Sequence, residues 1–357
     1  GNTIMMPTDV GFIEAAFGTK WQNSFGVSLQ QLLFEGQVFV GLQARRASIE
    51  FAQKGAEVTE EAVRANVYKI YYQLAASKYQ VQIIDANIAR LQKLSADTRK
   101  IYEAGFAEKL DIDKVTVQLN NLATERQKVI NMVDNGYFGL KTLLGMSYRD
   151  TLLLKDTVNL AQVREGILEA SEYKYEDRKE YQYAQKGLEL RRYNIKRYQL
   201  TYFPTVALSS NYSLLRQADK FGFGGPYSKG ASIGLNVSVP IFDGFAKAAR
   251  VQKARLELQQ SENQLEGLKM MIDNEAGTAR NNFINALSTL DNQQRNMELA
   301  EKVYNQTRKK YEIGAGSQTE ITNADADLRV AQSNYYNALY DAINARIDFL
   351  KATGKLQ

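Results

Sequence analysis

The side chains that most often carry catalysis at neutral pH are absent from this sequence. The 357 residues include no cysteine and no histidine. This composition excludes thiol nucleophiles, thiolate or imidazole metal sites and the Ser-His triad. Lys and Arg number 45 and Asp and Glu number 40, but no nucleophile–base pair stands out among the remaining polar residues. We therefore expect no enzyme, no cofactor and no metal site.

Two further clusters contain residue types that can carry chemistry. Residues 222–225 read Gly-Phe-Gly-Gly, but a phosphate loop needs a strand before it and a helix after it, and here a strand is expected on each side. Residues 191–197 hold the one dense basic cluster, whereas Lys and Arg elsewhere are interleaved with acids. Nucleic-acid binders concentrate their basic residues in a patch or stripe. We interpret the cluster as a solvated helix face and expect no nucleic-acid partner.

The elements around these residues are organised by an internal repeat. Tyr102-Glu103-Ala104-Gly105 returns 209 residues later as Tyr311-Glu312-Ile313-Gly314. The segment from Gly26 to Gly36 returns 208 residues later as 234–244, and Leu144-Gly145 returns as Thr353-Gly354. Three matches in one order at nearly one offset predict a duplication. We expect a first repeat over 1–165 and a second over 166–357.

Three segments alternate between large apolar and small polar residues, which is typical of strands. They are residues 21–34, 204–215 and 231–242. A complete duplication would have four. A run of about 10 residues is long enough to cross a bilayer as a tilted strand.

Helical periodicity dominates the rest of the chain. Only four prolines occur, and none lies between Pro7 and Pro204. Apolar residues repeat at intervals of three and four, as in coiled coils. The predicted helices cover 37–103, 108–144, 169–200, 245–312 and 317–353, with an irregular segment at 146–165. The two longest would each extend about 100 Å at 1.5 Å per residue.

The first repeat lacks counterparts of the helix at 169–200 and the strand at 204–215. We therefore expect that a preceding helix, strand and targeting signal belong to the natural chain. The sequence has no apolar run of 18 residues, so no transmembrane helix is expected.

Strands in lipid must form a closed sheet, because unpaired backbone groups there cost several kcal/mol each. Neither three nor four strands can close a barrel, for which the minimum is about eight. Three copies with four strands each would supply twelve. The alternative is a soluble coiled-coil scaffold, which explains the helices but does not explain the alternating strands.

Val239-Pro240-Ile241-Phe242-Asp243-Gly244, its partner Leu32-Leu33-Phe34-Glu35-Gly36 and the paired Tyr-x-x-Gly turns resemble the TolC family of outer-membrane efflux proteins. The resemblance covers essentially the whole chain. It implies a mainly helical homotrimer in which a twelve-strand β-barrel in the outer membrane continues into a helical coiled-coil tunnel in the periplasm. It also implies an exit duct that docks a periplasmic adaptor and an inner-membrane transporter and performs no catalysis. Drug efflux, metal efflux and protein secretion all remain open.

The resemblance also assigns roles to residues near the turns. Two turns are expected to form the periplasmic tip that contacts the adaptor: Gly105, Phe106, Ala107, Gly314, Ala315 and Gly316. Glu320 matches an acid that lines the tunnel constriction, although an acid in the first turn of a helix is also favoured by the helix dipole. The second constriction position is Asn323, and Asp325 or Asp327 is an alternative contributor.

Asp111 and Tyr311 match positions that latch neighbouring helices at the tip. The arginine that strengthens this latch in the family corresponds to Gly316, so that part is absent. Aromatic residues that flank the strands are expected at the lipid interface: Trp21, Tyr202, Phe203 and Tyr212.

Overall fold

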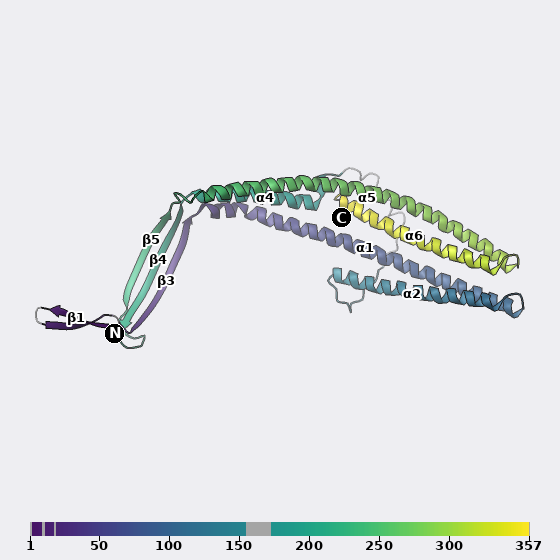
Figure 1. Cartoon of the computed structure of the whole chain (residues 1–357), viewed down its shortest axis with the longest axis horizontal. Helices are drawn as coiled ribbons and strands as arrows, with labels where there is room; N and C mark the ends of the chain where they lie inside the picture. Colours follow the sequence, from purple (N-terminus) through teal and green to yellow (C-terminus); the bar gives the residue numbers. More distant parts are fainter. Residues whose placement is uncertain (1, 9–10, 18, 155–172, 357) are drawn as a thin grey trace. The chain divides into compact units, whose positions relative to one another are not determined.

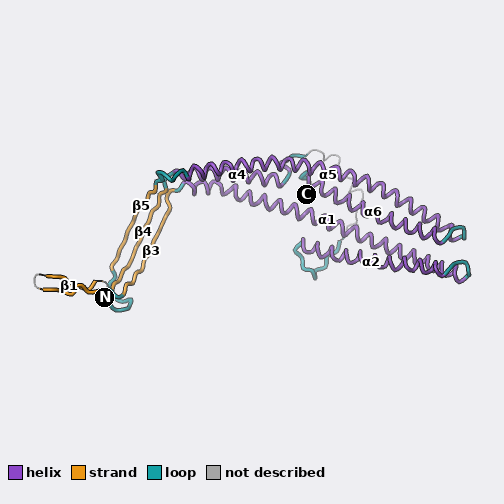
Figure 2. Tube along the Cα trace, in the orientation of Figure 1, coloured by secondary structure: helices purple, strands orange, loops and turns teal. Residues whose placement is uncertain are grey.

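The computed structural model describes residues 2–8, 11–17, 19–154 and 173–356 (Figure 1). Helices make up most of them, with a small sheet, as Figure 2 shows by colour. In chain order the elements are β1 (Asn2–Thr8), β2 (Gly11–Phe17), β3 (Trp21–Phe34), α1 (Gly36–Glu103), α2 (Lys109–Leu143), α4 (Lys179–Gln199), β4 (Thr205–Ala218), β5 (Ser228–Ser238), α5 (Ala246–Glu312) and α6 (Gln318–Ala352).

The three strands expected from the alternation form one antiparallel sheet in the order β3-β4-β5. The register places Val27 opposite Tyr212, and Leu208 opposite Leu235. Directly opposed residues of an antiparallel pair lie on the same face. Most of the large apolar residues of the three strands therefore share one face, while glycine, serine and asparagine predominate on the other.

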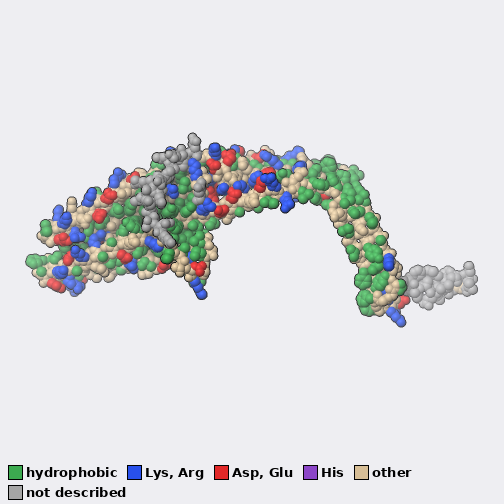
Figure 3. All heavy atoms as spheres, turned by 180° about the vertical axis from the view of Figure 1, so that it is seen from behind, with side chains coloured by type: hydrophobic (Ala, Val, Ile, Leu, Met, Phe, Trp, Pro, Cys, Tyr) green, Lys and Arg blue, Asp and Glu red, His purple; other side chains and the backbone are tan. Residues whose placement is uncertain are grey.

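The two outer strands of this sheet, β3 and β5, are exposed along almost their whole length in the single chain. Val27 on β3 is 73% exposed and Ile233 on β5 is 80% exposed. Figure 3 shows the hydrophobic side chains gathered over the strands. An exposed apolar patch of this kind marks a surface that contacts lipid or protein.

The strand boundaries differ from the expected ones. β4 continues to Ala218, where it pairs with Trp21, because pairing with β3 extends it beyond the alternating run. β5 begins at Ser228 and ends at Ser238, before Pro240, which has no N–H to donate to a ladder. The count of three strands was also wrong: β1 and β2 form a separate antiparallel hairpin.

The four long helices match the periodicity within about a residue, but the expected helix at 169–200 was too long. The helix proper, α4, begins at Lys179 after a 3₁₀ turn at Tyr175–Asp177. Residues 169–172 lie outside the described residues, as do residues 155–165 of the segment expected to be irregular. The remainder of that segment, up to residue 154, contains turns and no regular element beyond the end of α2.

Two compact units are present, and each draws on both halves of the sequence. The first comprises Gly1–Glu50 with Lys186–Glu262, and the second comprises Phe51–Gln185 with Asn263–Gln357. In the second unit, α1 with α2 and α5 with α6 form helical hairpins (Figure 2). Their core is built from leucine, isoleucine, tyrosine and alanine, with Leu91, Leu290 and Ile321 completely buried.

The two passages from strand to long helix, both in the first unit, are unlike each other. β3 is followed almost directly by α1, and a Cβ added at Gly36 would lie 2.7 Å from Leu200. After β5, residues 239–245 are irregular, and Gly244 and Phe245 both have positive φ, at 65° and 66°. The absence of a proline at Leu32, the counterpart of Pro240, agrees with this difference.

Candidate functional site

The turn between α1 and α2 and the turn between α5 and α6 have the same backbone design. Gly105 has φ +83° and Gly314 has φ +76°. The amide of Phe106 donates to the carbonyl of Ile101, and that of Ala315 donates to the carbonyl of Lys310, both at 2.9 Å. These are Schellman motifs, in which a left-handed glycine allows the chain to satisfy the last carbonyls of the helix. The sequence repeat therefore predicted two equivalent helix stops.

The two turns differ in their side chains. Phe106 is 86% exposed at the first turn, and Ile313 is 79% exposed at the second. Ala107 of the first turn corresponds to Gly316 of the second, where a Cβ would lie 3.1 Å from the backbone nitrogen of Tyr311. The second turn is therefore packed against the end of its helix more tightly than an alanine would allow without a shift.

Asp111 and Glu320 both serve as helix caps. The Asp111 carboxylate accepts from the amide of Glu108 at 3.4 Å, and it lies 3.6 Å from the Lys114 ammonium. The Glu320 carboxylate accepts from the amide of Ser317 at 3.3 Å, while Ser317 Oγ accepts from the amide of Glu320 at 3.2 Å. This reciprocal pair is a capping box. The Glu320 side chain is still exposed, so capping leaves its charge open to solvent.

Of the other constriction candidates, Asn323 and Asp327 are exposed on α6. Asp325 is completely buried, with its oxygens 2.9 Å from Arg90 Nε and 3.0 Å from Arg329 Nε. A buried carboxylate held between two guanidinium groups supports packing between α1 and α6. This finding removes Asp325 from the candidates for a charge facing a channel.

The expected latch pair is not in contact within the chain. The Tyr311 hydroxyl lies 3.4 Å from Thr98 Oγ1, which in turn lies 3.4 Å from Gln318 Oε1. Among the described residues, the Asp111 carboxylate contacts the Glu108 amide and the Lys114 ammonium. Tyr311 therefore joins the last turn of α5 to α1 within one chain. This contact could not be read from the sequence, because Thr98 and Tyr311 are 213 residues apart.

A groove of about 420 Å³ lies beside this contact, between α1 and α5. Four cations and two carboxylates line it: Arg90, Lys93, Lys100, Arg308, Asp97 and Glu312. The Arg308 guanidinium lies 2.8 Å from Glu312, and hydrogen bonding to it holds the pKa of that carboxyl below its usual value. The Arg90 guanidinium lies 4.6 Å from the centre of the Tyr304 ring.

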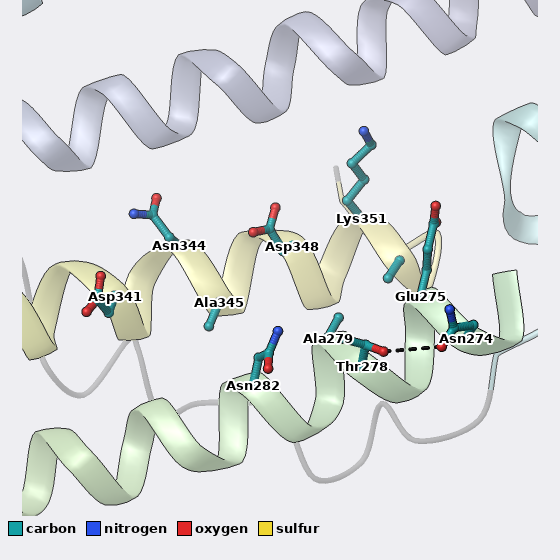
Figure 4. A pocket seen from close by; sticks show the side chains of 11 residues that line it. Asn274, Glu275, Thr278, Ala279, Asn282, Asp341, Asn344, Ala345, Asp348 and Lys351 are labelled. Atoms are coloured by element: carbon teal, nitrogen blue, oxygen red, sulfur yellow. Dashed lines mark hydrogen bonds between the residues drawn. The ribbon is translucent and has the colours of Figure 1, made fainter. Parts of the chain in front are cut away.

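A second groove, of about 550 Å³, runs between α5 and α6 (Figure 4). Amides, hydroxyls and carboxylates line it, including Asn282, Asn344 and Asp341, and the Thr278 hydroxyl donates to Asn274 at 3.4 Å. Asp348 on its rim lies 2.5 Å from the Lys69 ammonium. Over the described ranges, no group of three or more acids is placed to hold a metal ion.

A sequence model of the family described as outer membrane efflux protein matches residues 175–355, which is half of the chain. The chain belongs to the outer membrane efflux protein family. It is 21% identical over 340 residues to the outer membrane protein TolC of Vibrio cholerae, covering 93% of this chain and 77% of that protein. Identity to protein CyaE of Bordetella pertussis is 24% over 340 residues, covering 94% and 71%.

The fold agrees with this assignment. The outer membrane protein VceC of Vibrio cholerae superimposes with a TM-score of 0.72, covering 96% of this chain and 80% of that one at 14% identity. The efflux protein is thus an outer-membrane channel of the class that forms the exit duct of efflux and secretion systems. No helix in the described part of the chain has the length and hydrophobicity to cross a membrane.

The sheet of this efflux protein has aromatic residues at both ends. At the loop end, the Trp21 and Phe221 ring centroids lie 5.0 Å apart. At the helix end, Tyr202 and Phe203 are exposed just before β4. Tyr212, in contrast, lies in the middle of β4, because that strand is longer than its alternating run. It is on the apolar face and not at an end of the sheet, where we expected it.

Proposed function

We propose that three copies of the chain assemble into a homotrimer whose strands close one β-barrel. The observation that supports this most strongly is the sheet itself. Among the described residues, β3 and β5 each have one unpaired edge, and one face is apolar. Open edges cannot face lipid, so strands from other copies must pair with them. Four strands per copy would give twelve, an even number that outer-membrane barrels allow.

In this assembly the apolar face of the sheet contacts lipid and the face with Gly26, Ser28 and Gly234 lines the channel. Trp21 marks one membrane interface, and Tyr202 and Phe203 mark the other, because indole and phenol rings settle at the headgroup level. The division into two repeats, 1–165 and 166–357, explains why the two helical hairpins can alternate around the tunnel.

The two glycine turns form the periplasmic tip in this proposal. The exposed Phe106 and Ile313 side chains contact the periplasmic adaptor, which connects the tunnel to an inner-membrane transporter. Glu320 and Asn323 line the constriction, where three copies of Glu320 form a ring that attracts cations. Asp111 of one copy then reaches the tip of a neighbouring copy near Tyr311 as part of a latch.

Conduction is passive, and the chain performs no catalysis, because the driving energy comes from the transporter. A soluble coiled-coil scaffold would have no need of an apolar sheet face with Val27 and Ile233 exposed. Planar-bilayer recording of the purified protein tests the proposal. We expect discrete single-channel steps that are small while the tip is closed. A protein that stays soluble without detergent and adds no conductance would contradict it.

A further inference from the structure

Three short segments next to the sheet contain basic residues and no acidic ones. They are residues 36–49 at the start of α1, 190–202 at the end of α4 and 244–256 at the start of α5, and we call them the basic belt. Ten of the 45 Lys and Arg residues and none of the 40 Asp and Glu residues lie in the belt. Glu35 and Asp243 lie at the strand–helix junctions just outside it. Because the net charge is +5, the rest of the chain is net negative.

All of these basic residues are close to the helix ends that adjoin the strands. Arg45 and Arg46 follow the start of α1 at Gly36, and Lys247 to Arg255 follow the start of α5 at Ala246. Arg191 to Arg197 precede the end of α4 at Gln199. At 1.5 Å per residue, each lies within about 15 Å of a sheet-adjoining helix end.

Helix dipoles do not account for this distribution. Cations are favoured at helix C-termini and disfavoured at N-termini. α4 has its C-terminus toward the sheet, but α1 and α5 have their N-termini there. Neither α1 nor α5 has an acid in its first turn, while Lys247 lies in the first turn of α5. Basic residues therefore gather at helix N-termini as well as at a helix C-terminus. A negatively charged partner outside the chain, beside the ends of these helices, would account for both.

Several belt residues have no acidic partner among the described residues. Arg46 pairs with Glu50 at 2.7 Å, and Arg191 pairs with Glu257 at 3.5 Å. Four others are exposed and form no ion pair with any described residue: Arg45, Arg250, Lys253 and Arg255. These four cations lie near the starts of two helices, α1 and α5, so part of the positive charge beside the sheet is not compensated by acids of the described residues.

The belt continues the surface that contacts lipid. Tyr202 and Phe203 lie between α4 and β4, and the Lys247 ammonium lies 5.9 Å from the centre of the Tyr202 ring. Aromatic rings of this kind settle at the headgroup level. The headgroup layer is roughly 5–8 Å deep, and charges act about 8 Å further at physiological ionic strength. Residues within about 15 Å of the sheet therefore reach lipid phosphates.

We propose that the basic belt binds the anionic phospholipid headgroups of the outer-membrane leaflet that faces the periplasm. The anionic lipid would hold the channel at a fixed depth and fix the angle at which the helices leave the membrane. This rests on the membrane placement of the sheet, with its helix end toward the periplasm.

The test measures which lipids the purified full-length protein retains. The protein is reconstituted into vesicles of equal amounts of phosphatidylcholine and phosphatidylglycerol, re-extracted in mild detergent, and its bound lipids are quantified. The belt variant carries Arg250→Gln, Lys253→Gln and Arg255→Gln. The matched control carries Arg280→Gln, Arg295→Gln and Lys302→Gln, which are exposed residues further along the same helix.

We expect the wild-type protein and the control to retain an excess of phosphatidylglycerol that falls as salt is raised. The belt variant should lose at least about threefold of this excess, because one basic side chain near an anionic surface contributes up to about fivefold in binding. If the belt variant retained the same excess of phosphatidylglycerol as the wild-type protein, the proposal would be overturned. If the wild-type protein does not enter vesicles at all, the membrane placement itself is wrong, whereas entry without lipid preference refutes the belt alone.

Discussion

The hydroxyl of Tyr311 lies 3.4 Å from Oγ1 of Thr98, which joins the tip end of α5 to α1 within one chain. Thr98 is completely buried, so water could not easily take the place of the Tyr311 hydroxyl as its hydrogen-bond partner. The contact is in the region where the tunnel is proposed to narrow, and we propose that it helps Tyr311 to hold the tip closed.

Replacing Tyr311 with phenylalanine should raise single-channel conductance, because the two hairpins lose a hydrogen bond worth about 1 kcal/mol. Tyr102 is the counterpart of Tyr311 in the first repeat, and it is exposed. Tyr102→Phe is therefore the matched control and should leave the conductance unchanged. Adding Asp111→Ala to Tyr311→Phe should raise it further if Asp111 also latches the tip. Unchanged conductance in the double variant would refute the latch.

The variant Glu320→Gln distinguishes the two roles of this residue, which are to cap the helix and to select cations. A glutamine at this position can still accept from the Ser317 amide, so the capping box survives. If three Glu320 carboxylates line the constriction, the variant should lose cation selectivity, which the reversal potential in a salt gradient measures. Glu301→Gln, an exposed acid on α5, should leave the reversal potential in place. If Glu320→Gln leaves the reversal potential unchanged, Glu320 only caps the helix and does not select ions.

Asp325→Ala should destabilise the helical hairpins by about 3 kcal/mol, because it leaves the buried charges of Arg90 and Arg329 without a counter-ion. Asp327, two residues along, is exposed, and Asp327→Ala should change stability by less than about 0.5 kcal/mol. Thermal unfolding followed by circular dichroism compares the two. Equal midpoints would mean that the buried ion pairs contribute nothing.

Two glycine-to-alanine changes should shift the stability of the fold in opposite directions. Gly314→Ala forces a side chain into φ +76° and should destabilise by about 1 kcal/mol. Gly277 lies inside α5, where a Cβ would meet nothing within 4 Å, so Gly277→Ala should stabilise by about 0.5–1 kcal/mol. Unfolding midpoints that move in the same direction would contradict the role assigned to the turn.

Glu61 should give the fold a pH dependence of its own. It is buried, and its Oε2 has no hydrogen-bond partner in the described part of the chain. Burial, reinforced by the charge of Glu180, raises its pKa above 4.5. Between 4.5 and the raised pKa, the folded chain holds a proton that the unfolded chain has lost, so this group favours folding as pH falls. Glu61→Gln should raise the unfolding midpoint at pH 7 and reduce the difference from wild type near pH 4.5. A difference that is the same at both pH values would contradict this assignment.

The local features of the fold were readable from sequence because they depend on neighbouring residues. Apolar periodicity predicted the long helices, and the repeated glycines predicted where they stop, since only glycine adopts positive φ without strain. The β1–β2 hairpin was missed because its strands are short and Pro7 counts against a strand. The extent of β4 was missed because pairing with β3, not local alternation, determines it.

The contacts at the candidate tip were beyond prediction for a different reason. Arg90 and Asp325 are 235 residues apart, and no local pattern distinguishes the buried Asp325 from the exposed Asp327. Glu320 was singled out through the family resemblance, with a role at the start of the helix as the alternative. The capping box with Ser317 shows that it does cap the helix, and gating remains a proposal.

The mass of the detergent-solubilised protein tests the central claim most directly. The sheet has open edges and an apolar face, so several copies of the chain must combine to close it. Native mass spectrometry should give three times the 40.3 kDa of one chain, with bound phospholipid. A stable species of one chain in detergent, with no trimer at any protein concentration, would contradict the account.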